Sequence, residues 1–310
     1  MRVIKIFFLV IIIGVGWSGP ALAQFLTQPD EVQSVSVSPL TFELTANPGV
    51  KLTNKIKVSN PSSRPVKIRM SVEDFKPAGE TGSVIITDDE NYTYSLSKWI
   101  VVDPVEFTLP PSGSQLVTFV IDVPPTAEPG GHYGTVLAEA LPVEVQGGSA
   151  ISQKVGVLIL LSVSGEVTEQ LIIKEFSAPE FVESAPVRFL LRFENLGTVH
   201  VRPKGFISIT NMLGEKEVDL PFPQKNVLPG SIRKVEAEWK PDFALGKYTA
   251  TLVANYGINN LPLTAVVTFW VVPWKKILLI FSIIFVFLVF VFLARRRIYL
   301  ALKVLFTGDK

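Results

Sequence analysis

The chain has 310 residues, of which 48% are hydrophobic and 18% charged, and it contains no cysteine. The lack of cysteine excludes disulfides, thiol nucleophiles and thiolate metal sites, and two histidines are too few for a multi-histidine centre, so we expect no metal and no cofactor. The formal charge of +1 hides an acidic middle, because residues 24–274 hold 27 acidic and 20 basic side chains, which disfavours nucleic-acid binding.

The N-terminus carries the pattern of a secretory signal. Arg2 and Lys5 precede the apolar run IFFLVIIIGV at residues 6–15, and Pro20 is followed by the small-x-small sequence Ala21-Leu22-Ala23. We therefore predict a signal peptide over residues 1–23 and a mature N-terminus at Gln24.

A second apolar stretch lies near the C-terminus. Residues 277–294 carry no charge, and 18 residues of helix rise about 27 Å, close to the hydrocarbon thickness of a bilayer. This predicts a transmembrane helix over residues 275–294 and a cytoplasmic basic tail over residues 295–310, with the rest of the mature chain outside the cell. The residues expected to anchor this topology are Trp274, Arg295, Arg296 and Arg297.

Between the two apolar ends, short runs rich in Val, Ile, Thr and Phe are separated by Pro, Gly, Asn and Ser, with no sustained helical periodicity. Many short strands with frequent turns predict an antiparallel sandwich rather than an α/β fold. The expected strands include residues 35–37, 55–59, 66–70, 117–123, 135–140, 155–163, 187–193, 206–210, 234–239, 248–254 and 265–272.

The same order of short signals occurs twice. Asn60 and Asn195 each end a strand; residues 109–114 (LPPSGS) and 228–231 (LPGS) each precede one; GHYGTVL at 131–137 resembles GKYTATL at 246–252. The first two signals are 49 residues apart in the first copy and 33 in the second, which predicts an insertion within residues 75–98.

The repeat leads to a fold prediction: an all-β protein of two tandem immunoglobulin-like antiparallel β-sandwich domains plus one C-terminal transmembrane helix. We place the first domain at residues 24–165 and the second at residues 166–272. Because residues 151–165 form the last strand of the first domain and lead directly into the second, the linker is short and a semi-rigid rod is expected.

Aromatic side chains in and beside the insertion are the candidate ligand site. Ring faces stack on sugars or peptides, and acids and amides lie nearby in the sequence. The candidates are Tyr92, Tyr94, Trp99, His132 and Tyr133. Trp99 and Tyr133 could instead fill the sandwich core, whereas Tyr92 and Tyr94, flanked by polar residues, are the better surface candidates. No catalytic constellation is evident, and we predict that the protein is not an enzyme.

The order of several short motifs resembles the WxL-interacting cell-surface proteins. The motifs are VSPLTFEL at 37–44, NPG at 47–49, LPP at 109–111, PGGHYG at 129–134, FENLG at 193–197 and VLPG at 227–230. The resemblance implies that the first domain binds peptidoglycan or another wall glycan. It also implies that the second binds surface proteins, either WxL-type or host proteins, as part of envelope assembly or adhesion.

The main alternative is an envelope assembly chaperone that lends a strand edge to client proteins, since some periplasmic chaperones are tandem sandwiches. The membrane anchor and the lack of an evident basic pair for a cleft between the domains argue against it at the level of sequence. An enzyme or a sensor is disfavoured by the 16-residue tail.

Overall fold

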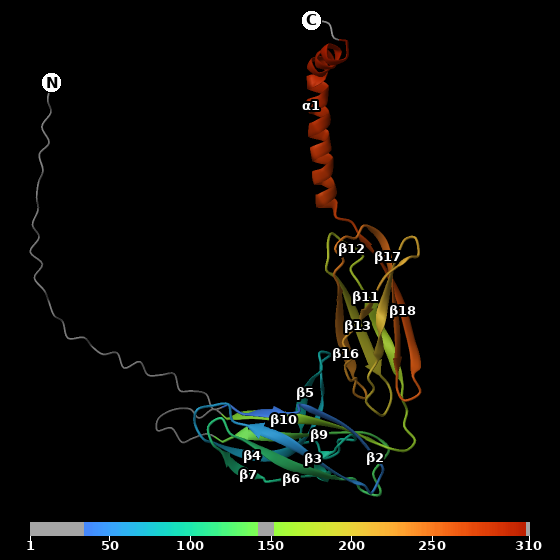
Figure 1. The fold of residues 1–310 in the computed structure, drawn as a ribbon. Helices are drawn as coiled ribbons and strands as arrows, with labels where there is room; N and C mark the ends of the chain where they lie inside the picture. Colours follow the sequence, from blue (N-terminus) through green and yellow to red (C-terminus); the bar gives the residue numbers. More distant parts are fainter. Residues whose placement is uncertain (1–33, 142–151, 308–310) are drawn as a thin grey trace, which may run out of the picture.

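The computed structural model describes residues 34–141 and 152–307. Within these ranges the chain forms two β-sandwiches followed by one long helix, α1 (Trp274–Thr307) (Figure 1). The predicted all-β, immunoglobulin-like architecture is confirmed, and each expected strand overlaps an observed one. The signal peptide predicted at 1–23 and the cleavage before Gln24 fall outside the described residues.

The first sandwich packs a four-stranded sheet against a larger one. The smaller sheet has the order β1-β3-β8-β6, and the larger has the order β2-β10-β9-β4-β5, with β7 also paired to β4. The smaller sheet contains β1 (Ser36–Ser38), β3 (Lys51–Ser59), β8 (Ser114–Asp122) and β6 (Ile100–Asp103). The larger contains β2 (Thr41–Ala46), β10 (Gln153–Val163), β9 (Gly130–Ala140), β4 (Val66–Ala78), β5 (Ser83–Thr87) and β7 (Glu106–Leu109).

The second sandwich repeats the plan with shorter connections. Its three-stranded sheet has the order β11-β13-β16, and its five-stranded sheet has the order β12-β18-β17-β14-β15. The smaller sheet contains β11 (Leu171–Ser177), β13 (Val187–Asn195) and β16 (Ile232–Trp239). The larger contains β12 (Phe181–Val182), β18 (Leu261–Val271), β17 (Gly246–Tyr256), β14 (Lys204–Asn211) and β15 (Lys216–Pro221).

Each sandwich has its own apolar core, formed by the inward residues of alternating strands. Phe119 and Val136 belong to the first core, and Phe189 and Phe269 to the second; all four are fully buried. Most strand pairs are antiparallel, but β2 pairs with β10, and β12 with β18, in parallel. In each sandwich, therefore, a strand from early in the domain, β2 or β12, covers one edge of the domain's last strand, β10 or β18.

The predicted insertion is a long hairpin. β4 pairs with β7 through its first residues and with β5 through its last five, Asp74–Ala78, so that the β4–β5 turn projects beyond the first sandwich. A short 3₁₀ helix, η1 (Ser97–Trp99), follows. Figure 1 shows the hairpin beside the second sandwich, near β16.

The two sandwiches do not form the expected rod. The strands of the first run across the axis that the second sandwich and α1 follow, so the molecule is bent at the junction (Figure 1). The linker is short, as predicted, with only residues 164–170 between β10 and β11. The bend is set by side contacts of the hairpin and of β9 with the second sandwich, which lie outside the linker and leave no mark on its sequence.

Residues Trp274–Arg295 are the one span in the described part of the chain that is long and apolar enough to cross a membrane, with a mean hydropathy of 3.4. The helix continues through Arg295, Arg296 and Arg297 to Thr307, so no separate tail helix begins after the arginines. Trp274, in the first turn, is exposed, and Lys275 Nζ lies 5.5 Å from the centre of its ring.

Candidate functional site between the two sandwiches

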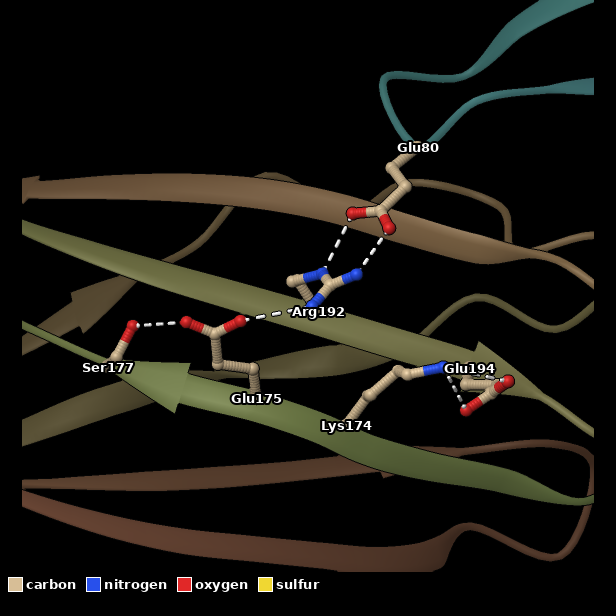
Figure 2. A network of polar contacts seen from close by, with 6 residues as sticks. All are labelled: Glu80, Lys174, Glu175, Ser177, Arg192 and Glu194. Carbon is tan, nitrogen blue, oxygen red and sulfur yellow. Dashed lines mark hydrogen bonds and ion pairs between the residues drawn. The ribbon is translucent and has the colours of Figure 1, made fainter.

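The β4–β5 turn fixes one side of the junction. Glu80 at its tip forms a two-pronged ion pair with Arg192 of β13, whose Nε donates to Glu80 Oε2 at 2.8 Å (Figure 2). Arg192 also contacts Glu175 of β11 at 3.2 Å, and the hydrogen bond from Arg192 holds the pKa of Glu80 below its ordinary value. The backbone adds a bond from Lys234 N to Glu80 O of 2.7 Å.

A second set of contacts joins the body of the first sandwich to the second. Gly131 N donates to Thr198 O at 2.9 Å. Glu43 of β2 pairs with Arg202 and accepts a bond of 2.7 Å from Asn226 Nδ2. These polar contacts lie on either side of an apolar cluster, described next, and hold the two sandwiches at a fixed angle.

The apolar cluster consists of Phe75, Tyr133 and Leu160, all buried, with Leu228 of the second sandwich packed against them. Tyr133 contacts Phe75 at a centroid distance of 6.0 Å and the His200 ring at 5.7 Å. Burial raises the pKa of Tyr133 far above its usual range and lowers that of His200 to about 4. Both rings are therefore neutral at pH 7 and act as packing groups.

A cleft of about 350 Å³ opens beside this cluster, between the two sandwiches. Its floor is apolar and comes from the first sandwich: Phe75, Val84, Leu158 and Leu160. Leu228, Arg202, Lys225 and Arg233 face it from the second sandwich, and Glu43, which pairs with Arg202, also lines it from the first. The cleft thus combines an apolar surface with basic groups on one side, of which Arg202 is already paired with an acidic group.

Arg233 is the unusual member of this set. In β16 the inward residues are Val235, Ala237 and Trp239, and alternation places Arg233 on the same side, where an apolar residue is expected. Its Nε is buried, and within residues 34–141 and 152–307 it has no hydrogen-bond partner. Burial lowers the pKa of its guanidinium, and no acidic side chain in the described part of the chain offsets the effect.

The hairpin is shaped to receive this guanidinium. Gly82 lies in the β4–β5 turn with a φ of +90°, and a Cβ there would overlap the head group of Arg233. Arg202 is already paired with Glu43, whereas Arg233 has no carboxylate partner among the residues that the structure describes. Leaving the buried Nε of a cation unpaired is costly, and a ligand carboxylate in the cleft would reduce that cost.

The five aromatic and histidine residues predicted from the sequence lie close together, but mostly inside the fold. Tyr133 is 1% exposed and His132 6%, so neither is the open surface residue that ligand contact suggests, although His132 lines the groove described below; ligand contact by either residue stays a prediction. Both ring nitrogens of His132 are engaged, at 3.0 Å from the backbone oxygens of Ser95 and Glu128. Tyr133 fills the junction because the two sandwiches meet there, which a periodicity argument within one strand does not reveal.

Tyr92 and Tyr94 are half-buried rather than free surface residues. Their rings contact each other at 5.9 Å, and Tyr94 contacts Tyr133 at the same distance. Burial raises the pKa of Tyr92 to about 12. The polar neighbours that favoured exposure of these tyrosines belong to a loop that folds back onto β9, where Tyr133 N donates to Tyr94 O at 2.7 Å.

Trp99 lies at a separate, shallow groove of about 300 Å³, where its ring packs 4.4 Å from that of His132. Thr93, Lys98, Thr126 and Glu128 supply polar groups around it. Of the predicted aromatic residues, Trp99 is the one that both lines an open groove and is surrounded by groups suited to a hydroxylated ligand.

Sequence reasoning missed Arg233. The signal was present in the segment IRKVEAEW, where alternation places Arg233 on the same inward-facing side of the strand as Val235, Ala237 and Trp239. A charged residue at an inward position near a strand end is a mark of a junction or a site. The cleft itself needed the three-dimensional arrangement, because its two walls come from different sandwiches.

No family model matches the chain, and no curated protein matches it. Among solved structures, it is similar to a class 5 fimbriae chaperone, CfaA, with a TM-score of 0.39 and 15% identity over 76% of this chain and 99% of that one. It is also similar to the Pseudomonas aeruginosa CupB2 chaperone, with a TM-score of 0.36 and 12% identity over 76% and 100% of the two chains. At these values the likeness carries no functional conclusion.

Proposed function

We propose that this protein is a non-catalytic, membrane-anchored protein of the cell envelope that binds an extended segment of a partner protein in the cleft between its sandwiches. The observation that carries this proposal is Arg233, a half-buried cation that has a buried, unpaired Nε and no carboxylate partner among the described residues, beside an apolar floor. An apolar segment ending in a carboxylate, such as the C-terminus of an exported protein, matches both features.

A strand edge without a paired strand, next to the cleft, supports an extended partner. β9 covers one side of β10 along its whole length, but β2 covers the other side only from Leu158 to Val163. In the described part of the chain, no strand pairs with the outer side of residues 153–157, although β1 lies beside it and Val35 N donates to Gln153 Oε1 at 3.0 Å. A partner segment that leaves the cleft at Leu158 would add to the sheet here by displacing this neighbouring segment.

The topology belongs to the proposal. After removal of residues 1–23, the sandwiches would lie outside the cytoplasmic membrane, α1 would span it, and the basic groups from Arg295 onward would face the cytoplasm. Trp274 would lie at the outer interface. Arg296 and Arg297 belong to the same helix, but the positions of their side chains are not described.

This reading favours the chaperone-like alternative, the lending of a strand edge, over adhesion. Membership of the WxL-interacting family remains a prediction, since no family model tests it. A WxL-type wall protein would fit as the partner if its C-terminus is apolar. The same cleft would serve any exported protein with that chemistry.

The test uses the full chain in detergent and a fluorescent peptide of alternating valine and threonine that ends in leucine. The free-carboxylate peptide should bind, and the amidated peptide should bind about 10- to 100-fold more weakly, as expected for loss of a charge-assisted bond. Arg233→Met keeps the apolar stem of the side chain and removes its charge. This variant should lower the affinity for the free-carboxylate peptide by a similar factor and leave the affinity for the amidated peptide unchanged.

Arg188→Met is the matched control, because Arg188 lies on β13 at the other end of the second sandwich and pairs with Glu238 at 2.9 Å. This variant should bind like the parent. If the parent protein bound the two peptides with equal affinity, the cleft would not be a carboxylate-binding site.

The groove at Trp99 favours a second candidate, the wall glycan that the family resemblance implies. Aromatic rings flanked by hydroxyl and charged groups suit sugar rings, and the acidic first sandwich offers no attraction to anionic polymers. If the peptides fail to bind while insoluble peptidoglycan sediments the protein through Trp99, glycan binding becomes the better account. Tyr92 and Tyr94, being half-buried, are poor test positions for it.

A further inference from the structure

We propose that the end of the second sandwich next to α1 dips into the headgroup region of the same bilayer, so that its loops form a second membrane contact. The inference rests on the proposed membrane anchoring by α1. It adds that the second sandwich, and not the helix alone, contacts the bilayer. It makes no use of the cleft.

Large apolar side chains are exposed at this end. Met212 and Leu213, in the β14–β15 turn, are 70% and 78% exposed, and Phe243, in the β16–β17 loop, is 72% exposed. Phe181 in β12 is 67% exposed. Four large apolar groups on three separate connections form an unusual surface for a domain that faces only water.

Strand register places these groups level with the start of the helix. Asn211, at the end of β14, pairs with Tyr248, which pairs with Phe269 of β18. Met212 and Leu213 therefore extend from the level of Phe269 toward Pro273 and Trp274. Gly246 pairs with Val271, so the preceding loop with Phe243 reaches the same level.

The fold does not require apolar residues in the β14–β15 turn. Asn211 Oδ1 accepts bonds from Leu213 N at 2.9 Å and Glu215 N at 3.0 Å. Gly214 supplies the positive φ of +81°. The Asn211 side chain and the Gly214 backbone form the turn without help from the side chains of Met212 and Leu213, so polar residues at these two positions would serve equally well in water.

The helix leaves the domain through a short, braced link. Only Val272 and Pro273 separate β18 from α1, and Val272 N donates to Val182 O at 2.9 Å. Lys275 in the first turn of the helix pairs with Glu183 at 2.9 Å. The apolar loops are thus held at the base of α1, where a helix long enough to span a bilayer must enter it.

Continuity with α1 identifies lipid as the occupant. The exposed apolar face of the helix starts beside these loops, and Trp274 with Lys275 has the character of an interfacial anchor. A partner protein on the loops would have to lie in the same thin layer as the lipid headgroups.

The absence of cysteine permits single-site labelling of the full chain. Leu213→Cys and Phe243→Cys each receive an environment-sensitive fluorophore, and the protein is reconstituted in vesicles of phosphatidylcholine and phosphatidylglycerol. Both labels should shift to the blue, and lipids carrying a quencher near the headgroup should lower their emission at least about two-fold. Met212→Cys provides a third position if one variant is poorly produced.

Ile258→Cys is the matched control, because Ile258 is 83% exposed in the turn at the opposite end of the same sandwich. Its label should stay water-like and unquenched. Labels at Leu213 and Phe243 that behave like the control would overturn the inference, as would quenching that disappears when protein is diluted in lipid, the sign of a second copy. Flotation of the vesicles measures separately whether α1 inserts into the bilayer. The affinity for the peptides measures separately whether the cleft binds a partner.

Discussion

At the scale of single residues, two buried asparagines show that the sandwiches are built alike. Asn60 Nδ2 donates to Arg64 O at 2.7 Å and Pro110 O at 3.0 Å. Asn195 Nδ2 donates to Val199 O and Val227 O at 2.9 and 2.8 Å. In each copy the side-chain oxygen accepts the N–H two residues later. The repeat read from the sequence therefore has a physical basis, since each asparagine joins two loops.

Replacing Asn195 tests this role. Asn195→Ala should lower the free energy of unfolding by about 3 kcal/mol, because two buried carbonyls and the Gly197 N–H lose their partner. Asn255→Ala, at an exposed position on β17, should change it by less than about 0.5 kcal/mol. Urea denaturation followed by circular dichroism measures both, and equal losses for the two variants would contradict the role.

His200 predicts a pH dependence. Burial lowers its pKa to about 4 from an ordinary value of 6.5, while Glu43 opposes and Arg202 reinforces the shift. Between these pH values the unfolded chain binds more protons than the folded one, so stability falls as pH decreases from 6.5 to 4. From pH 7 to pH 5 the loss should be about 2 kcal/mol.

His200→Gln is the matching variant, because it removes the titrating ring and leaves the carboxylates unchanged. Its stability should change less between pH 7 and pH 5 than that of the parent, by about the same 2 kcal/mol. Parallel pH profiles for the two proteins, measured by urea denaturation, would show that His200 is accessible to protons in the folded state.

At the scale of elements, the sequence predicts the strands and the insertion but not the contact that the insertion makes. Period-two patterns are local, and they placed β3, β8, β10 and β17 correctly. Glu80 gave no signal, because one acidic residue in a turn is common. Glu80 matters because it pairs with Arg192, which is 112 residues away in the sequence. Arg233 differs, since its inward-facing position is a signal in the sequence, but the predicted strand 234–239 began one residue after it and the signal was missed.

Loss of the Glu80–Arg192 pair should loosen the junction without unfolding either sandwich. In Glu80→Ala, spin labels on cysteines at Lys55 and Lys247, one in each sandwich, should show a broader distance distribution, because the β4–β5 turn loses its side-chain contacts (Figure 2). Pulsed electron spin resonance measures it. Glu90→Ala, in an exposed loop of the same insertion, is the control. An unchanged distribution in Glu80→Ala would mean that the apolar cluster alone sets the bend.

At the scale of the whole molecule, the bend determines where the candidate site lies. The sequence pattern predicts two domains and a short linker, and a rod is the simplest arrangement of those parts. The hairpin and Tyr133 replace the rod with a bent form, because together they bury an apolar cluster that neither sandwich closes alone. The cleft exists only in that arrangement, which is why residues such as Phe75 and Leu228 could not be linked in advance.

The two-residue connection between β18 and α1 makes the second sandwich a lever. β18 has 11 residues, so the cleft lies roughly 36 Å from the start of the helix at about 3.3 Å per residue. If helix and sandwich move together, a change of about 10° in the tilt of the helix carries the cleft sideways by roughly 6 Å. If α1 spans a bilayer and the cleft binds a partner, as we propose, the thickness of that bilayer would then set the height and reach at which the protein meets its partner.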